Sequence, residues 1–460
     1  MPPELRGSDL AAVREQLGRE PTVAFSVAAR CLAGHPIVIR NATRDADGTP
    51  FPTTFWLTCP EAVRAIARLE SAGAIADLTV RSFADVAFAR GIEEAHAEAA
   101  ELRERVEPGS GAWGGVAGTR RGLKCLHAHY ANHLGGGDDV VGRWVAERVE
   151  PVHGVAPDAV AAAIDQGTNS SRLSVLARSG DAVVELARDM TITRLGRGVD
   201  ATGRLDPEAL QDTEAVLRRY VRRATALGAA RVAVGATSAI RDAADRDLFV
   251  AAVRALTGED PEVIAGVREA VLSYDGGTRT LEPGDGPFLV VDIGGGSTEL
   301  VLGREPAGAP DRAVSLQVGS VRLRERLGEG ADLSSLDAEI APLLQEAAMI
   351  LDGGARTLVG VGGTPATLQA WALGLDRDDP DVIHGSSLTR ERVEQARSAL
   401  ASMTPAERDG LPFMPPGRGD VIVAGASILL AVMARSGLDD VLVSETDILD
   451  ALAREALDVR

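Results

Sequence analysis

The chain has 460 residues and a formal net charge of −19, with the apolar and charged fractions of a globular protein. This length allows two or three domains, and the negative charge opposes nonspecific association with nucleic acid or acidic lipid. No stretch is long and apolar enough to span a membrane, and the start of the chain lacks a basic region followed by an apolar one. We therefore expect a cytoplasmic protein with neither a membrane nor a nucleic-acid partner.

The numbers of cysteine and lysine residues bear on disulfide bonding and on how a polyanion could bind. The three cysteines, Cys31, Cys59 and Cys125, all lie in the first third of the chain, which is unlike a secreted disulfide framework. Lys124 is the only lysine. A polyanionic ligand would therefore have to meet a local cluster of arginine.

The first 150 residues predict a small α+β module. Strands are expected at 23–29 and 36–40, and helices at 60–72 and 83–106. Pro108 and several glycines end the second helix. A linker rich in turn-forming residues is expected at 148–158.

A cysteine and histidine cluster follows within this module. On a helix, Cys125, His129 and His133 would be four residues apart and share one face, which could bind Zn²⁺ if Cys31 or Cys59 completed the site. The alternative is a buried free cysteine beside hydrogen-bonded histidines. Both interpretations stay open at the level of sequence.

The module resembles the family known as domain of unknown function 501. The residues that carry the resemblance are Gln16–Pro21, Arg30 and Cys31, Asp47–Thr53, Arg68–Gly73 and Lys124–His127. This resemblance supplies no activity.

Two later stretches share an unusual pattern, in which an apolar strand ends in an acid and a turn of glycines and hydroxyls leads to a second strand. They lie at 161–176, around Asp165, and at 290–301, around Asp292. Such turns can hold phosphate through backbone N–H groups, and the acids can hold Mg²⁺. A single glycine-rich hairpin can equally be an ordinary turn, but two copies indicate facing half-sites. The arrangement resembles the duplicated nucleotidase fold of actin, the sugar kinases and the chaperone ATPases.

Other segments fit α/β lobes. A helix is expected at 206–227, and residues 232–243 form a strand, a small-residue turn and a helix that carries Arg241. Further on, 360–370 turns from a strand into a helix, and 420–434 forms a helix with an apolar face.

From about Ala156 onward the chain resembles the exopolyphosphatase and guanosine pentaphosphate phosphohydrolase family. The matching motifs are Ala163–Ser170 with Arg172, Ala236–Ala243, Val263–Ala270, Val291–Glu299, Val318–Arg322, Gly360–Thr364, Ile383–Gly385, and Gly417–Ile422 with Gly425. The resemblance implies duplicated actin-like, ribonuclease H-like lobes with a cleft between them. We place lobe I at 156–285 and lobe II at 286–460, and we expect the last helix to pack back on lobe I. The chain looks like the short form of the family.

The resemblance also implies roles for individual residues. Glu269 would be the catalytic carboxylate, which positions water, and Arg241 would neutralise charge that develops on phosphate. Asp165, Asp292 and Glu299 would hold Mg²⁺. The terminal phosphates would bind to Asn169, Ser170, Gly294, Gly295, Gly296 and Ser297.

The expected function is Mg²⁺-dependent release of terminal phosphate from inorganic polyphosphate, by a homodimer. The close alternative is hydrolysis of guanosine pentaphosphate, and a protein that senses polyphosphate or nucleotide without turnover is a third. Two positions depart from the family pattern: Gln166 replaces an apolar residue, and Arg268 replaces a second glutamate beside Glu269. Arg268 could lower the pKa of Glu269 or bind the substrate chain.

Overall fold

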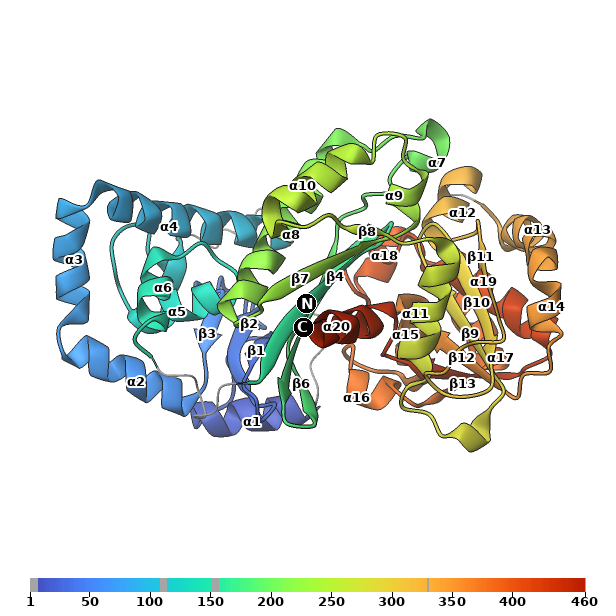
Figure 1. Cartoon of the computed structure of the whole chain (residues 1–460), viewed down its shortest axis with the longest axis horizontal. Helices are drawn as coiled ribbons and strands as arrows, with labels where there is room; N and C mark the ends of the chain where they lie inside the picture. Colours follow the sequence, from blue (N-terminus) through green and yellow to red (C-terminus); the bar gives the residue numbers. More distant parts are fainter. Residues whose placement is uncertain (1–6, 108–113, 150–156, 329–330, 460) are drawn as a thin grey trace. The chain divides into compact units, whose positions relative to one another are not determined.

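The computed structural model describes residues 7–107, 114–149, 157–328 and 331–459 (Figure 1). Contacts between Cα atoms divide the chain into two compact units. The first comprises Met1–Ala162, Ser174–Asp189 and Arg218–Val232, and the second comprises Ala163–Leu173, Met190–Leu217 and Ala233–Arg460. Most of the expected linker, residues 150–156, lies outside the described residues.

The first unit begins with an α+β module, as the sequence predicts. Its antiparallel sheet has the order β1 (Phe25–Arg30), β2 (Pro36–Asn41), β3 (Phe55–Leu57). The helices are α1 (Gly7–Leu17), α2 (Pro60–Ser71), α3 (Ala74–Ala84), α4 (Val86–Val106), α5 (Leu126–Leu134) and α6 (Val140–Ala146), with a 3₁₀ turn at Val116–Gly118. The helix expected at 83–106 is interrupted at Asp85, whose side chain accepts a hydrogen bond from the backbone N–H of Phe88 and so starts α4.

The core of this module joins all its layers. Cys31 and Cys59 are buried in one apolar cluster with residues of β2, β3 and α2 to α6. All three cysteines are free. Arg103 of α4 is 1% exposed and donates to the backbone carbonyls of Phe51 and Pro52, which holds the loop before β3 against the helix.

The C-terminal half of helix α8 (Pro207–Ala226) also belongs to the first unit. Ala226 and Leu227 pack against the module's core. Arg223 is 3% exposed, and it donates to the carboxylate of Asp189 and to the carbonyl of Ala28 in β1. A buried guanidinium with such partners ties the module to α8.

Two further sheets have the same strand order. In one, β4 (Ala159–Gln166), β5 (Ser170–Ser179), β6 (Ala182–Ile192), β7 (Arg231–Ala236) and β8 (Glu262–Val263) lie in the order β6-β5-β4-β7-β8. In the other, β9 (Phe288–Ile293), β10 (Thr298–Gly303), β11 (Arg312–Leu316), β12 (Thr357–Val361), β13 (Ser387–Thr389) and β14 (Asp440–Ser444) lie in the order β11-β10-β9-β12-β14-β13. Numbered from its first strand, each sheet reads 3-2-1-4-5, and β13 is added at one edge of the second.

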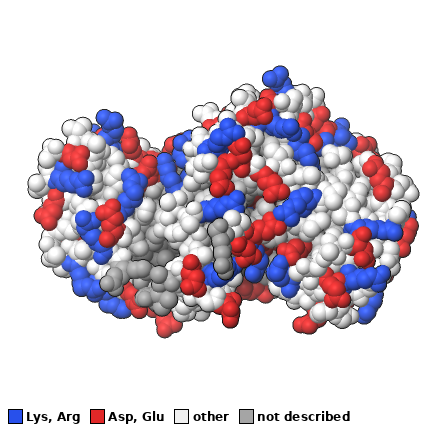
Figure 2. All heavy atoms as spheres, viewed as in Figure 1, with Lys and Arg blue, Asp and Glu red and all other residues white. Residues whose placement is uncertain are grey.

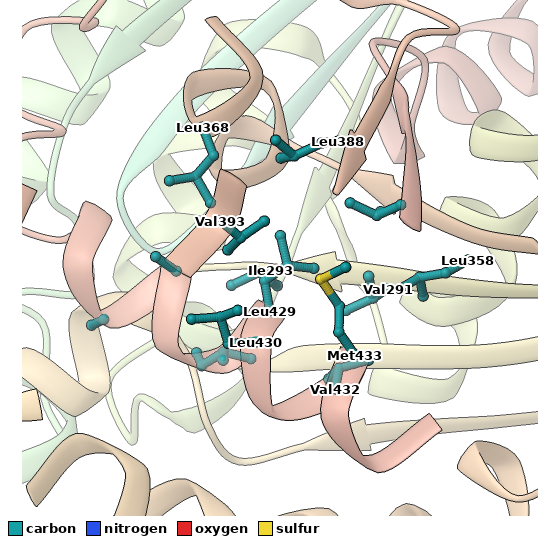
Figure 3. Close-up of a cluster of buried hydrophobic side chains, with 14 of the residues drawn as sticks. Val291, Ile293, Leu358, Leu368, Leu388, Val393, Leu429, Leu430, Val432 and Met433 are labelled. Atoms are coloured by element: carbon teal, nitrogen blue, oxygen red, sulfur yellow. The ribbon is translucent and has the colours of Figure 1, made fainter. Parts of the chain in front are cut away.

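Helices cover both faces of the second sheet. Successive side chains of a strand point to opposite faces, so each strand contributes to two apolar clusters. Val291 and Ile293 of β9 join the large apolar cluster with α12 (Ser320–Leu327), α13 (Leu333–Leu343), α15 (Gly363–Leu373), α17 (Arg390–Ala401) and α19 (Ile422–Ser436). Figure 3 shows Leu429, Val432 and Met433 of α19 in this cluster. The alternate residues Phe288 and Val290 meet Tyr274 of α11 (Gly266–Thr278) on the other face.

The last helix, α20 (Ile448–Asp458), packs on α11. Its Leu452 also lies close to Gly235 of β7, where a Cβ would come within 2.9 Å of the leucine side chain. This contact places α20 against the first of the two related sheets.

The remaining helices are short, with one exception of 11 residues. They are α7 (Val199–Thr202), α9 (Ser238–Asp242), α10 (Asp247–Thr257), α14 (Ala348–Leu351), α16 (Pro380–Ile383) and α18 (Pro405–Asp409), with 3₁₀ turns at Pro283–Asp285 and Leu344–Ala347. Within the described residues, no helix combines the length and the apolar character that crossing a membrane requires. On the face shown in Figure 2, acidic and basic side chains are interspersed.

Candidate active site

Two turns of the second unit have the same local structure. We call Asp165–Ser170 the first acidic turn and Asp292–Ser297 the second acidic turn. In the first, the N–H of Gly167 donates to the carbonyl of Ser170 at 2.9 Å, and in the second the N–H of Gly294 donates to the carbonyl of Ser297 at 3.0 Å. Acid, glycine and serine thus stand at the same spacing and close the same turn in both copies.

Hydrogen bonds to the turns' carbonyl groups orient their amides. In the second acidic turn, the carbonyls of Gly294 and Gly295 accept from the N-terminus of α12, at Ser320 and Val321. In a trans peptide the C=O of one residue and the N–H of the next point in opposite directions. The N–H groups of Gly295 and Gly296 therefore point away from α12, and no described residue accepts from either.

The first acidic turn is fixed in the same way. The carbonyl of Thr168 accepts from Gly196, and that of Asn169 accepts from Thr193 and Arg194. The N–H groups of Asn169 and Ser170 are consequently turned to the opposite side. Each turn presents two successive amides, which is the geometry that binds an anion.

Three sequence motifs meet at Gly296. A Cβ on this residue would lie 2.5 Å from Oγ of Ser238 in α9 and 2.8 Å from Oγ1 of Thr168 in the first acidic turn. Only glycine leaves room for these hydroxyls. A pocket beside them is lined by Thr168, Gly196, Ser238, Gly296, Arg322 and Glu325, among others.

Asp165, at the end of β4, is buried beside an arginine. Arg172 donates to Oδ2 of Asp165 through Nε at 3.0 Å and through Nη2 at 2.6 Å, and through Nη1 to Asp447, which caps α20. Oδ1 of Asp165 is buried and has no hydrogen-bond partner among the described residues. Burial raises the pKa of Asp165, and the carboxylate of Asp447 adds to the rise.

Asp292, at the same place in the second acidic turn, is supported by a hydroxyl. Ser273 of α11 donates to its Oδ2 at 2.5 Å. Burial raises the pKa of Asp292 to about 7, and the charges of Asp447 and Asp165 contribute to the rise. Glu299 is the cross-strand neighbour of Asp292 in the β9–β10 pair and accepts from Ser315 at 2.6 Å. Its pKa is well above the usual value because of burial and the nearby Glu269 and Asp292.

Glu269 lies in the first turn of α11 and is 8% exposed. Its Oε2 accepts from Nη1 of Arg241 at 2.8 Å, and the same nitrogen donates to the carbonyl of Ile264 at 2.7 Å. Nη2 of Arg241 is buried and donates to no described residue. Burial raises the pKa of Glu269 to about 7 against the opposing effect of Arg241.

The charges of this cluster do not balance. Five buried carboxyl groups interact there, those of Asp165, Glu269, Asp292, Glu299 and Asp447. Two guanidinium groups, of Arg172 and Arg241, face them. Buried carboxylates favour a hard cation with oxygen ligands, and the unpartnered Oδ1 of Asp165 offers one. The residues present therefore fit a divalent metal ion.

The structure brings the expected acids together and gives two of the expected phosphate donors, Gly294 and Ser297, other partners. Asp165, Asp292, Glu269, Glu299 and Arg241 interact as one cluster. The N–H of Gly294 is used within its own turn, and the hydroxyl of Ser297 is directed to Glu299. This leaves the N–H groups of Gly295 and Gly296 as the donors of the second acidic turn.

The two departures from the family pattern are explained by their contacts. Gln166 is buried; its Oε1 accepts from Ser171 at 2.6 Å and its Nε2 donates to the carbonyl of Gly167 at 3.0 Å, so it stiffens the first acidic turn. Arg268 is paired with Glu455 of α20 and with Glu262. The structure therefore gives no support to a contact of Arg268 with Glu269 or with substrate.

Sequence reasoning missed Asp447, Ser273, Ser238 and Thr168 as parts of the site. In the sequence, Asp447 precedes an apolar helix and indicates only a helix cap. It does cap α20 in the structure. Ser273 lies four residues after Glu269, on the same face of α11. That spacing is the one signal in the sequence that could have identified it.

The expected cluster of Cys125, His129 and His133 is corrected by the structure. Helix α5 begins at Leu126, and Cys125 is extended, with φ −162° and ψ 126°. It therefore does not share a helical face with the two histidines. His129 directs Nδ1 to Asp139 at 2.8 Å, and its Nε2 is buried without a hydrogen-bond partner among the described residues.

Both regions of the chain match known protein families. Residues 175–448 match the family model of the Ppx/GppA phosphatase family, and residues 27–147 match that of a protein family of unknown function, DUF501. The chain is 41% identical over 316 residues to "Exopolyphosphatase 2" of Mycobacterium tuberculosis (strain CDC 1551 / Oshkosh), which covers 64% of this chain and 97% of that protein. It is 30% identical over 306 residues to "Guanosine-5'-triphosphate,3'-diphosphate pyrophosphatase" of Vibrio vulnificus (strain YJ016), which covers 64% of this chain and 59% of that protein.

Solved structures match the same region. A crystal structure of an exopolyphosphatase-like protein has a TM-score of 0.61 and 33% identity, over 65% of this chain and 98% of the other. The Aquifex aeolicus member of the Ppx/GppA family has a TM-score of 0.56 and 29% identity, over 65% and 98%. These likenesses confirm the predicted α/β fold with two related lobes. The chain therefore belongs to the Ppx/GppA phosphatase family, and a DUF501 region precedes the part that it shares with that family.

Proposed function

We propose that the protein hydrolyses the terminal phosphoanhydride bond of inorganic polyphosphate and releases phosphate. The observation that carries the proposal is the pairing of Glu269 with Arg241. One guanidinium nitrogen holds the carboxylate at 2.8 Å, and the other is buried without a partner. The carboxylate that accepts a proton from water, on Glu269, thus lies beside an unused phosphate donor on Arg241.

Each residue then has a distinct task. Glu269 orients a water molecule and takes its proton as the water oxygen attacks the terminal phosphorus. Nη2 of Arg241 and the N–H groups of Gly295 and Gly296 donate to the phosphoryl oxygens, where negative charge develops. The bond from phosphorus to the bridging oxygen breaks. The bridging oxygen stays on the shortened chain, and the terminal unit is released as phosphate.

We propose Mg²⁺ as the cofactor, held by Asp165, Asp292 and Glu299. When bound, the ion would polarise the phosphoryl group and neutralise its charge. The supporting observations are the unpartnered Oδ1 of Asp165 and the excess of buried carboxyl groups over guanidinium groups. Arg172 keeps Asp165 in place through two donors, and Ser273 does the same for Asp292 through one.

Guanosine pentaphosphate is the second candidate substrate, because the chain is 30% identical to the Vibrio vulnificus enzyme over the shared region. Both substrates end in the same phosphoanhydride. A sensor without turnover is disfavoured, because it would not need a buried carboxylate beside an unused phosphate donor.

One experiment separates these functions. Phosphate release is measured on polyphosphate and on guanosine pentaphosphate with one preparation of the full chain, with and without Mg²⁺. We expect Mg²⁺-dependent release, faster on polyphosphate. Faster release from the nucleotide would favour the second candidate, and binding of either ligand without release would identify a sensor.

We further propose a cytoplasmic homodimer without a nucleic-acid partner. The low isoelectric point of about 4.9 supports the last point, since the protein repels polyanions away from its binding site. Light scattering of the full chain after size exclusion tests the oligomeric state.

A further inference from the structure

A second polar cluster lies in the N-terminal module, where α2 meets the start of α5. Cys125 directly precedes α5, and the N–H of Leu126 donates to Oε1 of Glu70 at 2.6 Å. Nδ1 of His127 lies 3.3 Å from this Oε1 and 3.6 Å from Sγ of Cys125. A thiol, a carboxylate and an imidazole nitrogen therefore converge. Among the described residues it is the one group of three His, Cys, Asp or Glu side chains whose ligand atoms all lie within 4.8 Å of one another.

The other ring nitrogen fixes the tautomer of His127. Nε2 lies 3.1 Å from the carbonyl of Val63, and a carbonyl can only accept, so Nε2 carries a proton. In a neutral ring, Nδ1 then presents a lone pair to Sγ and Oε1. Three electron-pair donors facing one another repel unless a metal ion or a proton lies between them, and the hydrogen bond with Cys125 raises the pKa of His127 to about 9. Metal-binding histidines commonly direct their second nitrogen to a backbone carbonyl in this way.

The separations fit a metal ion better than a direct hydrogen bond. Tetrahedral zinc, with Zn–S about 2.3 Å and Zn–N or Zn–O about 2.0–2.1 Å, places sulfur and nitrogen about 3.5 Å apart and nitrogen and oxygen about 3.3 Å apart. The structure has 3.6 Å and 3.3 Å. A charge-assisted hydrogen bond between imidazolium and carboxylate would shorten the second distance to about 2.7–2.9 Å.

We propose that Glu70, Cys125 and His127 bind one zinc ion, with its fourth position open to solvent. The side chains of His127 and Glu70 are 22% and 25% exposed, so the site is accessible from one side. A thiolate together with an imidazole selects zinc over Mg²⁺, which prefers oxygen ligands. The site is therefore chemically distinct from the acidic cluster around Asp292.

The ion would join segments that are far apart in the sequence. Glu70 is in the last turn of α2, and Cys125 and His127 lie 55 and 57 residues later. Metal binding to a folded site adds its free energy to the stability of the fold. Removing the metal should therefore loosen the contact between α2 and α5 and leave the phosphate site intact.

The test uses the full chain, purified without chelator and then assayed for zinc. We expect about one equivalent, and less than about a tenth of an equivalent in Cys125→Ala and His127→Ala. Cys31→Ala is the matched control, since it removes a buried thiol outside the cluster and should retain the metal. Circular dichroism and phosphate release verify that each variant is folded.

Cobalt distinguishes this cluster from the acidic site. Co²⁺ added to metal-free protein should give a thiolate-to-cobalt charge-transfer band that Cys125→Ala lacks, because the acidic cluster contains no sulfur. Absence of both zinc and this band from folded protein would overturn the proposal. So would rapid alkylation of Cys125 in the presence of excess zinc, which would instead identify a free reactive thiol.

Discussion

Arg268 and Glu269 are neighbours in the sequence but face different surroundings. Successive residues of an α-helix point about 100° apart. In α11 this turns Glu269 inward to Arg241, while Arg268 is directed to Glu455 on α20. A neighbour of the proposed catalytic glutamate can thus lie outside the site, which a sequence motif alone does not reveal.

Glu269→Gln tests the proposed water acceptor. The amide keeps the size of the side chain and loses its ability to take a proton, so turnover should fall by roughly 10²–10⁴-fold while polyphosphate still binds. Phosphate release and equilibrium binding measure the two effects.

The control is Arg268→Ala, which changes the adjacent residue and leaves the acidic cluster unaltered. It should keep turnover within about threefold of the unchanged protein. Near-normal turnover in Glu269→Gln would show that another group activates the water.

Asp292 makes stability depend on pH. Its pKa rises from 3.8 to about 7 on folding, so the metal-free folded state retains a proton that the unfolded chain has already lost. The stability that this group contributes is complete below about pH 4 and is lost as the pH rises through about 7. The melting temperature of chelator-treated protein should fall over this interval.

Two comparisons isolate the contribution of Asp292. Asp292→Asn should flatten the slope, because the amide does not titrate. Mg²⁺ should raise the melting temperature more at pH about 8 than at pH about 5, since it takes the place of the proton. An equal slope in the variant would assign the pH dependence to other groups.

At the scale of elements, local patterns predicted several of the strands and longer helices that the structure contains. The strands at 25–30 and 36–41, α2, α8 and α19 lie within a few residues of their expected bounds. Helix α3 was missed because Gly73, with φ 96°, separates it from α2 and no capping side chain marks its start. The short β3 and β8 have too few residues to show a period.

The acidic turns were predicted because each is a continuous motif with an internal copy. Their partners could not be predicted in the same way. Asp447 and Ser273 reach the cluster through the packing of α20 and α11, and such packing brings together residues that are distant in the sequence. Short patterns carry no information about the contact of Asp447, whereas Ser273 is marked only by its spacing from Glu269 on α11.

Gly296→Ala tests the close approach of the three motifs. The added Cβ would meet the hydroxyls of Ser238 and Thr168 at 2.5 Å and 2.8 Å, so either these side chains or the second acidic turn must shift. We expect phosphate release to fall at least about tenfold, because catalysis is sensitive to a displacement of about 1 Å.

Gly284→Ala provides the matched control. Its added Cβ meets nothing within 4 Å, and its backbone is not left-handed. Activity should be unchanged in this variant. Full activity in Gly296→Ala would mean that the amides of Gly295 and Gly296 do not bind the phosphate.

At the scale of the whole molecule, the N-terminal module and the family region are connected through α8. All the proposed catalytic residues lie beyond residue 157, so a fragment that lacks the module should still release phosphate. The intended boundary near Val155 lies outside the described residues. The same fragment should be less stable, because Arg223 loses the carbonyl of Ala28 while it keeps Asp189, and because Ala226 and Leu227 lose the core of the module.

The expected loss of stability can be expressed as a free energy of unfolding. The loss of one hydrogen bond from a charged donor costs roughly 1.5–3 kcal/mol, which lowers the melting temperature by about 2 °C or more. Calorimetry of the fragment and the full chain, with phosphate release on both, measures the outcome. A folded fragment that hydrolyses neither substrate would show that the module contributes to catalysis.

The two acidic turns also differ in the group that holds each acid. They share their hydrogen-bonded frame, but Asp165 is held by a permanent positive charge and Asp292 by a neutral hydroxyl. A symmetric pair of turns would accept a uniform chain of phosphates equally well from either side. The two orientations are therefore not equivalent at this site, because only one half carries a fixed guanidinium beside its acid.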